Sequence, residues 1–392
     1  MSWLSNWQYR KKIIIQGQSG AGTDYQVLLK VGESSGASGC DFHVENHSSN
    51  FPNDKNQSGD LRFTKSDGKT LLKFWVEKVE GTSPNCVAYC WVKIEDNLDN
   101  NVDIYCYYGN PNADNVSNGD NTFIFFDDAS SDKSANYEWV DIYDTPFSPV
   151  LSYDSANKEY DLSHSEHDNE FLKIKDVAIS NVCARAKFKV TDSEPTNPND
   201  QFGFFLRHSG LARPNDKGYL LRITRFTDPN QLLIHTQDGG INETNLAAVN
   251  LSENISLDEQ YEFEAKVYGN TFSCSVKKMD GTELASASAS NSTYNYDKVA
   301  VQFAYHQVTK VSFENLIVRK YVDPEPLFSS VGNEEEKGEE TYSYNYQADS
   351  FIIRCIDSSL PLDSLLYPFQ RKLVRKSDGS FIAVYHKEIS NV

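Results

Sequence analysis

Tyr105-Cys106-Tyr107-Tyr108-Gly109-Asn110-Pro111 is the stretch of this chain that decides its fold. Its tyrosine-rich first half has the composition of a β-strand, because aromatic side chains are enriched in strands. Its second half is a Gly-Asn-Pro turn, and the proline stops the strand since it has no N–H to donate to a sheet ladder. The stretch therefore predicts a β-sheet protein with short strands and tight turns.

Short strands of the same kind lie on both sides of this stretch. In the first part of the chain, strands are predicted over residues 9–15, 25–31, 71–77, 87–94 and 102–108. In the second part, residues 261–268 alternate apolar and mostly charged side chains, which is the period of a half-buried strand. Gly269-Asn270 then turns the chain into the next strand. Strands at this spacing are typical of antiparallel sandwiches.

The expected architecture is all-β, with two antiparallel β-sandwich, jelly-roll-like domains in series and a short β tail. We expect the first sandwich over residues 1–126, the second over 127–322, a linker over 323–341 and a hairpin tail over 342–392. The linker is rich in proline and glutamate, a composition that keeps a segment extended and solvated. The tail is interpreted either as the first strands of a propeller or as an arm for assembly.

The motifs of the first sandwich resemble the domain of unknown function 2341 family over about residues 7–128. The matching motifs are Trp7-x-Tyr9-Arg10-Lys11, Asp60-Leu61-Arg62-Phe63-Thr64, Leu71-Leu72 with Trp75, Trp91-Val92-Lys93, the turn at 107–111, Ser117-Asn118-Gly119 and Phe126-Asp127-Asp128. The second sandwich is similar to a concanavalin A-like or laminin G-like lectin jelly roll, through residues 218–223, 261–267 and 312–318. These resemblances imply a β-rich module of surface or secreted proteins, followed by a lectin-like one.

The charge balance of the chain limits its partners. Lysine and arginine number 37 against 56 aspartates and glutamates, a net charge of −19. Such a surface repels nucleic acids and anionic lipids, so neither is an expected partner. No apolar run approaches the ~20 residues that cross a membrane, and the first residues do not have the pattern of a signal peptide. We expect an extracellular, cell-surface or virion protein: either its signal peptide has been removed, or it is exported by another route, or it is part of a virion.

Cysteines and asparagines supply candidate covalent sites. The chain has seven cysteines, which cannot all pair with one another. Cys90 and Cys106 end two strands that are predicted to form a hairpin, so a disulfide between them is one interpretation and buried free thiols are the other. Candidate glycosylation sites in Asn-x-Ser/Thr motifs are Asn46, Asn56, Asn115, Asn242, Asn254 and Asn291.

Four oxygen-bearing side chains form a candidate calcium site. Asp127 and Asp128 open the second sandwich, and Glu314 and Asn315 lie near its end. In a jelly roll the first and last strands are neighbours, so these hard ligands are expected to converge. The alternative is that they are ordinary carboxylates at strand ends, since calcium prefers six or more oxygen ligands.

Side chains near predicted turns of the second sandwich form the candidate ligand site. The set is Trp139, Tyr143, Arg207, Tyr294, Tyr296 and Tyr305. Sugar rings stack on aromatic side chains while polar groups hold their hydroxyls. The alternative for each aromatic residue is a place in the core. Glu262 and Glu264 share one face of a strand, as a glycosidase pair would, but we interpret them as charges on a solvated outer face.

No catalytic constellation stands out in the sequence, so a non-catalytic function is predicted. The favoured function is glycan binding or adhesion, with glycans or other surface proteins as partners and structural calcium as a candidate cofactor. One alternative is a structural subunit of an external filament or capsid, a homo-oligomer assembled through its tail strands. Another is a pair of accessory modules ahead of a truncated propeller glycosidase.

Overall fold

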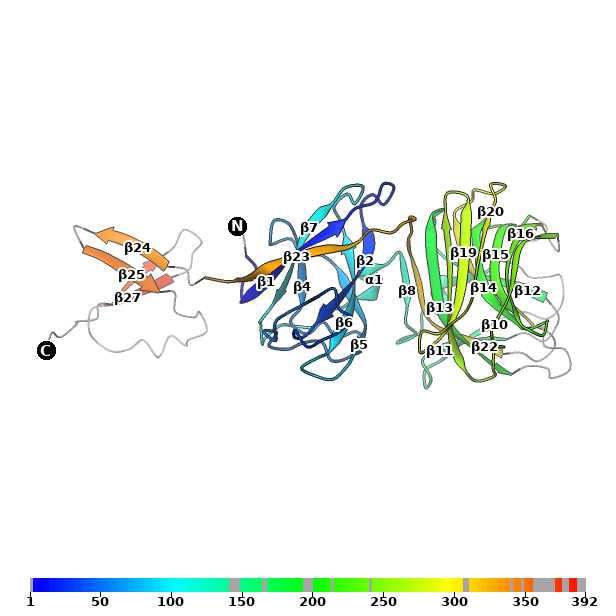
Figure 1. Ribbon diagram of the computed structural model, residues 1–392, viewed down its shortest axis with the longest axis horizontal. Coiled ribbons are helices and arrows are strands. Elements are labelled where there is room, and N and C mark those ends of the chain that lie inside the picture. The colour runs from blue at the N-terminus through cyan, green and yellow to red at the C-terminus, as the bar shows by residue number, and fades with distance from the viewer. Residues whose placement is uncertain are drawn as a thin grey trace. The chain divides into compact units, whose positions relative to one another are not determined.

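The computed structural model describes residues 3–140, 149–163, 168–192, 200–212, 215–239, 242–305, 310–338, 341–346, 349–354, 371–375 and 381–385. Strands make up almost all of its regular structure and form mainly antiparallel sheets (Figure 1), which confirms the all-β prediction. The helical elements in this part of the chain are α1 (Gly119–Thr122) and the 3-10 turn η1 (Ser134–Asn136). The chain divides into two compact units, residues 1–334 and 335–392, and each has its own sheets.

The first sandwich consists of two four-stranded sheets, named sheet A and sheet B. Sheet A contains, in order, β23 (Leu327–Glu336), β1 (Tyr9–Gln16), β7 (Val102–Tyr108) and β4 (Arg62–Lys65). Sheet B contains β3 (Phe42–His43), β2 (Tyr25–Gly32), β6 (Val87–Ile94) and β5 (Phe74–Glu80). Alternate side chains of both sheets, such as Ile13 and Ile15 of β1 and Leu29 and Val31 of β2, fill the core between them. The period of two seen in the sequence places these residues on one face of each strand.

The last strand of sheet A comes from a distant part of the sequence. Residues 323–341 were expected to be a solvated linker, but Leu327–Glu336 forms β23 beside β1 (Figure 1). The physical reason is that this segment has specific partners. Phe328 stacks on Phe42 of β3 at 6.1 Å, and Glu334 accepts a hydrogen bond from the Tyr108 hydroxyl at 2.6 Å. The second sandwich is therefore inserted between two strands of sheet A.

The second sandwich consists of two large sheets, named sheet C and sheet D. Sheet C contains β10 (Val150–Asp154), β11 (Glu159–Ser163), β22 (Lys310–Lys320), β13 (Val182–Asp192), β18 (Gln260–Tyr268), β19 (Thr271–Lys278) and β20 (Glu283–Ser290), and β8 (Phe125–Asp127) also pairs with β22. Sheet D contains β17 (Glu243–Asn250), β16 (Gln231–Asp238), β15 (Lys217–Thr224), β14 (Gln201–His208), β21 (Lys298–Tyr305), β12 (Asp168–Ile174) and β9 (Tyr137–Trp139). Their facing side chains form one large core in which stacked rings, such as Phe188 on Phe202 at 4.8 Å, join the sheets.

The two sandwiches are in direct contact. Trp75 and Trp91 of sheet B pack against Phe123, Phe126 and Ile317, so an apolar cluster joins the two parts of the chain. Beside this cluster, Arg185 of β13 forms an ion pair with Glu77 of β5, and both side chains are largely buried. The outer face of sheet C is therefore covered in part by the first sandwich.

This contact corrects the expectation for Glu262 and Glu264. Both were expected on a solvated face, but Glu262 lies 3.7 Å from Arg185 and Glu264 bonds Lys266. Burial alone would raise the pKa of Glu264, but the charges of Lys266 and Arg319 outweigh it and lower the pKa to about 2. Glu264 is thus held as a carboxylate by neighbouring cations, and both glutamates form ion pairs, which is a structural arrangement and not the acid–base pair of a glycosidase.

The structure also corrects the expected hairpin of Cys90 and Cys106. Cys90 lies on β6 of sheet B and Cys106 on β7 of sheet A, so their strands belong to opposite sheets of the sandwich. Both thiols are buried in the shared core and both are free. Burial raises the pKa of each, so they remain protonated and act as small apolar side chains.

The second unit contains two short hairpins. One pairs β24 (Thr341–Tyr346) with β25 (Asp349–Arg354), and the other pairs β26 (Arg371–Arg375) with β27 (Phe381–Tyr385), both antiparallel. The strands predicted in the tail are therefore present.

Candidate functional site

The three carboxylates of the candidate calcium site bond to separate groups. β8 does lie beside β22, with Asp127 opposite Leu316, but the carboxylates turn to different partners. Asp127 accepts hydrogen bonds from the Tyr137 hydroxyl at 2.8 Å and from the Ala129 N–H at 3.0 Å. Glu314 accepts from Gln260 at 2.9 Å and lies 3.4 Å from the Lys187 amine.

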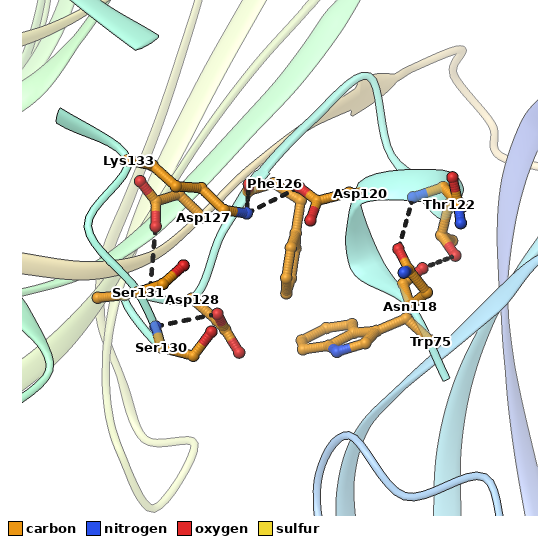
Figure 2. A network of polar contacts seen from close by, with 12 residues as sticks. Trp75, Asn118, Asp120, Thr122, Phe126, Asp127, Asp128, Ser130, Ser131 and Lys133 are labelled. Carbon is orange, nitrogen blue, oxygen red and sulfur yellow. Dashed lines mark hydrogen bonds and ion pairs between the residues drawn. The ribbon is translucent and has the colours of Figure 1, made fainter. Parts of the chain in front are cut away.

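The surroundings of the acidic pair are shown in Figure 2. There Asp128 accepts a hydrogen bond from the Ser130 N–H, and the Lys133 amine reaches Asp120 and the carbonyl of Phe126. Asp128 also accepts a hydrogen bond from the Asn56 amide. In the part of the chain that the structure describes, no group of three or more histidine, cysteine, aspartate or glutamate side chains could hold a metal ion. Asp128 therefore bonds across the junction to Asn56 of the first sandwich, whereas Asp127 bonds Tyr137 within the second.

Two of the six candidate ligand residues are structural. Trp139 packs on the core of the second sandwich, with its ring 5.7 Å from Phe303. Arg207 is buried at a β-bulge of β14 and donates to the carbonyl oxygens of Ser180 and Gly269. Burial lowers the pKa of its guanidinium. Tyr143 lies outside the described residues, as does the side chain of Tyr305.

The remaining pair, Tyr294 and Tyr296, forms an aromatic platform. Both lie in the loop between β20 and β21, and their rings stack at 6.1 Å with an angle of 18°. Tyr219 of β15 holds the loop, because its hydroxyl accepts from the Tyr294 N–H at 3.0 Å and its ring packs edge-on against Tyr294 at 5.8 Å. Tyr296 is 39% exposed, so one ring of the stack is presented to solvent.

An ion pair borders this platform. Lys217 at the start of β15 bonds Asp238 at the end of β16, with 2.7 Å between amine and carboxylate. The hydrogen bond to Asp238 raises the pKa of Lys217. Burial, and then the bond to Asp238, raises the pKa of Tyr294 to about 12. We name Lys217, Asp238, Tyr294 and Tyr296 together the tyrosine platform.

Lys217 and Asp238 did not appear among the residues singled out from the sequence. Each directly adjoins a glycine, in Lys217-Gly218 and Asp238-Gly239, and glycine beside a charged residue is typical of a strand end. A charged residue at a strand end was therefore the signal that the sequence offered for each of them. The pairing of β15 with β16, which sets Lys217 opposite Asp238, was not available from the sequence.

A second polar cluster occupies the outer face of sheet D. Arg222 of β15 donates to both carboxylate oxygens of Glu243, and His235 Nδ1 lies 2.8 Å from the same carboxylate. All three side chains are mostly buried. Arg222 and His235 stand at outward positions in otherwise apolar strands, which was a readable signal in the sequence. Both terminal nitrogens of Arg222 and the His235 ring bond Glu243, so the cluster ties the edge strand β17 to β15 and β16.

This cluster predicts a loss of stability in acid. Burial alone would raise the pKa of Glu243, but the hydrogen bond from His235 and the charge of Arg222 lower it from 4.5 to about 2. A carboxyl with a lowered folded-state pKa stabilises the protein above its unfolded pKa, and this contribution disappears as pH falls from about 4.5 to about 2. Between pH 5 and pH 2 the melting temperature of Glu243→Gln should therefore fall less than that of the wild type. If thermal melts show that the melting temperatures of the two proteins fall equally with pH, Glu243 is not the source of the acid sensitivity.

The candidate glycosylation sites differ in accessibility. Asn46, Asn115, Asn242 and Asn254 are exposed, and Asn56 and Asn291 are partly buried. The side-chain nitrogen of Asn56 donates to Asp128 at 2.9 Å, and its oxygen accepts from the Trp75 indole. The atom that a glycan would modify at Asn56 is therefore already engaged inside the junction.

Comparisons with known proteins agree with the fold. Residues 57–142 match the family model described as Domain of unknown function (DUF2341), which bears out the resemblance for that part of the chain. No curated protein matches the chain. No helix of the described residues is long and apolar enough to cross a membrane.

Several solved structures of binding proteins are similar to about half of the chain. The carbohydrate-binding module CBM66 from Bacillus subtilis has 14% identity over 45% of this chain and 96% of its own, with a TM-score of 0.34. The CBM2 module of the evolved Dit of Lactobacillus casei BL23 phage J-1 has 12% identity over 50% and 94%, with a TM-score of 0.38. The Lotus tetragonolobus seed lectin has 10% identity over 52% and 99%, with a TM-score of 0.36. At these values the likeness carries no argument about this chain.

Proposed function

We propose that this protein binds glycans without catalysis, and that the tyrosine platform is where it does so. One observation carries the proposal: an exposed tyrosine ring, backed by a second ring, stands beside a lysine–aspartate ion pair. The apolar face of a sugar stacks on such a ring, and the ion pair offers both a donor and an acceptor to its hydroxyls. The proposed setting is extracellular, on a cell or virion surface.

The platform is suited to a weak, specific contact. Its position is fixed by Tyr219, which belongs to the core, so little ordering of the backing ring is needed when a ligand binds. The exposed partners, Lys217 and Asp238, already satisfy each other, so a ligand adds hydrogen bonds without first uncovering a buried charge. Carbohydrate-binding modules and a lectin occur among the similar structures, but the proposal rests on the platform and not on them.

The test is a glycan array followed by calorimetry with the best array ligand, each with calcium and with a chelator. Tyr296→Ala should weaken binding at least about tenfold, equivalent to ~1.4 kcal/mol, because the stacking surface is removed. Phe226→Ala is the matched control. Phe226 is 62% exposed in the turn at the opposite end of the same β15–β16 hairpin, and its removal should leave the affinity unchanged.

Two results would contradict the proposal. A wild-type protein that binds nothing on the array in either condition would remove the glycan function. A ligand that binds Tyr296→Ala as tightly as the wild type would place the site elsewhere on the molecule.

A further inference from the structure

The free edges of the sheets in the two sandwiches differ in how they are protected. An exposed edge strand offers unpaired N–H and C=O groups to other strands, and proteins usually block it with short strands, charges or bulges. β3, β4 and β9 are at most four residues long, and β10 has five. β5 carries a bulge and the charged residues Glu77, Lys78 and Glu80, while β23 ends in three glutamates.

β20 has none of this protection over most of its length. It is eight residues long, and after Glu283 its sequence is Leu-Ala-Ser-Ala-Ser-Ala-Ser, without charge or proline. It lies at the end of sheet C, next to β17 at the edge of sheet D. Its bulge lies near Glu283, and there the Ser252 N–H donates to the carbonyl of Leu284, so the beginning of the strand is covered.

The hydrogen-bond pattern shows which groups of β20 face the open edge. In an antiparallel ladder, hydrogen-bonded pairs alternate with pairs whose N–H and C=O groups point away from each other. Asn291 donates to the carbonyl of Asn270 at 2.9 Å, and these residues lie directly opposite each other in the register. Ser290, Ser288 and Ser286 therefore direct their N–H and C=O groups away from β19, toward the free edge.

We propose that this edge is a self-association surface, at which β20 of two copies pair antiparallel and join two sheets C into one. This proposal concerns assembly and is independent of glycan binding. The occupant is a second copy because the edge is complementary to itself. Two antiparallel copies of a strand of alternating serine and alanine place no charged side chains opposite each other. Serine hydroxyls on the facing strands can also bond each other.

The surface beside the edge leaves room for such a neighbour. On the outer face of sheet C, a shallow cavity of about 410 Å³ runs along β18, β19 and β20. Its floor is formed by small hydroxyl side chains, Ser273 and Ser275 on β19 and Ser286 and Ser288 on β20. No long side chain of β20 after Glu283 overhangs the edge, so the backbone of a second strand can approach to the usual ~4.8 Å.

The experiment measures the mass of the full chain by size-exclusion chromatography with light scattering over a range of concentrations. We expect the wild type to form a dimer of the 44.3 kDa chain. Ser288→Pro removes an edge N–H and blocks pairing on that side, but the ladder with β19 does not use this N–H, so the fold is retained. It should weaken dimerisation at least about tenfold, since each copy loses an interstrand hydrogen bond.

Two further variants make the result specific. Ser288→Lys places like charges face to face across the dimer and should also yield monomers, whereas Ser288→Thr keeps the N–H and the hydroxyl and should dimerise like the wild type. Hydrogen exchange over residues 285–291 should slow as concentration rises in the wild type and not in Ser288→Pro. A wild type that stays monomeric at every soluble concentration, or a dimer that Ser288→Pro and Ser288→Lys leave intact, would overturn the proposal.

Discussion

Replacing Trp75 with alanine is expected to lower the free energy of unfolding by about 3–5 kcal/mol, the range for removing a large buried ring. Trp75 is 1% exposed and its ring packs edge-on against Phe126 at 4.8 Å and Phe123 at 5.7 Å. Its indole N–H also donates to the side chain of Asn56, which in turn bonds Asp128. The substitution therefore leaves a cavity at the centre of the contact between the sandwiches. It also removes the indole donor from the Asn56 side chain that bonds Asp128.

Urea unfolding monitored by circular dichroism measures this effect, and in thermal melts the melting temperature should fall by about 10 °C. Leu71→Ala is the matched control, because Leu71 lies four residues earlier in the chain, is 46% exposed and should change stability by less than about 0.5 kcal/mol. Trp75→Phe keeps a ring in the cluster and should fall between the two. If Trp75→Ala lies within 1 kcal/mol of the wild type, the cluster does not hold the sandwiches together.

The sequence predicted the strands of this protein well, because their signal is local. Alternation in residues 261–268 and the Gly269-Asn270 turn correspond directly to β18, the following turn and β19. The order of strands within the sheets was not available in the same way. Cys90 and Cys106 lie on strands that follow each other in the sequence but belong to opposite sheets, and no local pattern records that change of sheet.

For the candidate sites, too, local features could be predicted from the sequence and long-range contacts could not. Tyr294 and Tyr296 were singled out because aromatic residues near a predicted turn are visible in the sequence. Their polar neighbours depend on which strands pair, as Lys217 and Asp238 show. The acidic pair at 127–128 was visible in the sequence, but its distant partners come from β9 and from the loop before β4, which composition cannot bring together.

β23 is the clearest case of information missing from the sequence. Its glutamates predict a solvated segment, and most of its side chains are indeed exposed. What makes it a strand is a small number of long-range contacts, among them Glu334 with Tyr108 and with His47. Such contacts are separated by more than 200 residues, so only the folded structure reveals that the chain returns to its first sheet.

The return of the chain to the first sandwich leads to the second prediction, that Glu325→Ala will destabilise the protein by ~2–4 kcal/mol. Glu325 accepts hydrogen bonds from both terminal nitrogens of the Arg319 guanidinium, one of them at 2.9 Å. It also accepts a hydrogen bond from the Tyr25 hydroxyl at 2.9 Å. The Arg319 side chain is only 6% exposed, so removing the carboxylate leaves a buried cation without its partner, a change that costs about 3–5 kcal/mol when both partners are buried. The expected value is lower because the Glu325 side chain is 30% exposed.

Chemical unfolding of three further variants separates this explanation from a general sensitivity to losing charge. Asp103→Ala removes a carboxylate from the exposed ion pair with Lys12 and should cost less than about 1 kcal/mol. Glu325→Gln keeps an acceptor for Tyr25 and should be milder than Glu325→Ala. Arg319→Met combined with Glu325→Leu replaces both charges with apolar groups and should be more stable than Glu325→Ala alone, because no unpaired cation remains buried. A double variant that is less stable than Glu325→Ala would show instead that the ion pair itself, and not the avoidance of an unpaired buried charge, stabilises the returning segment.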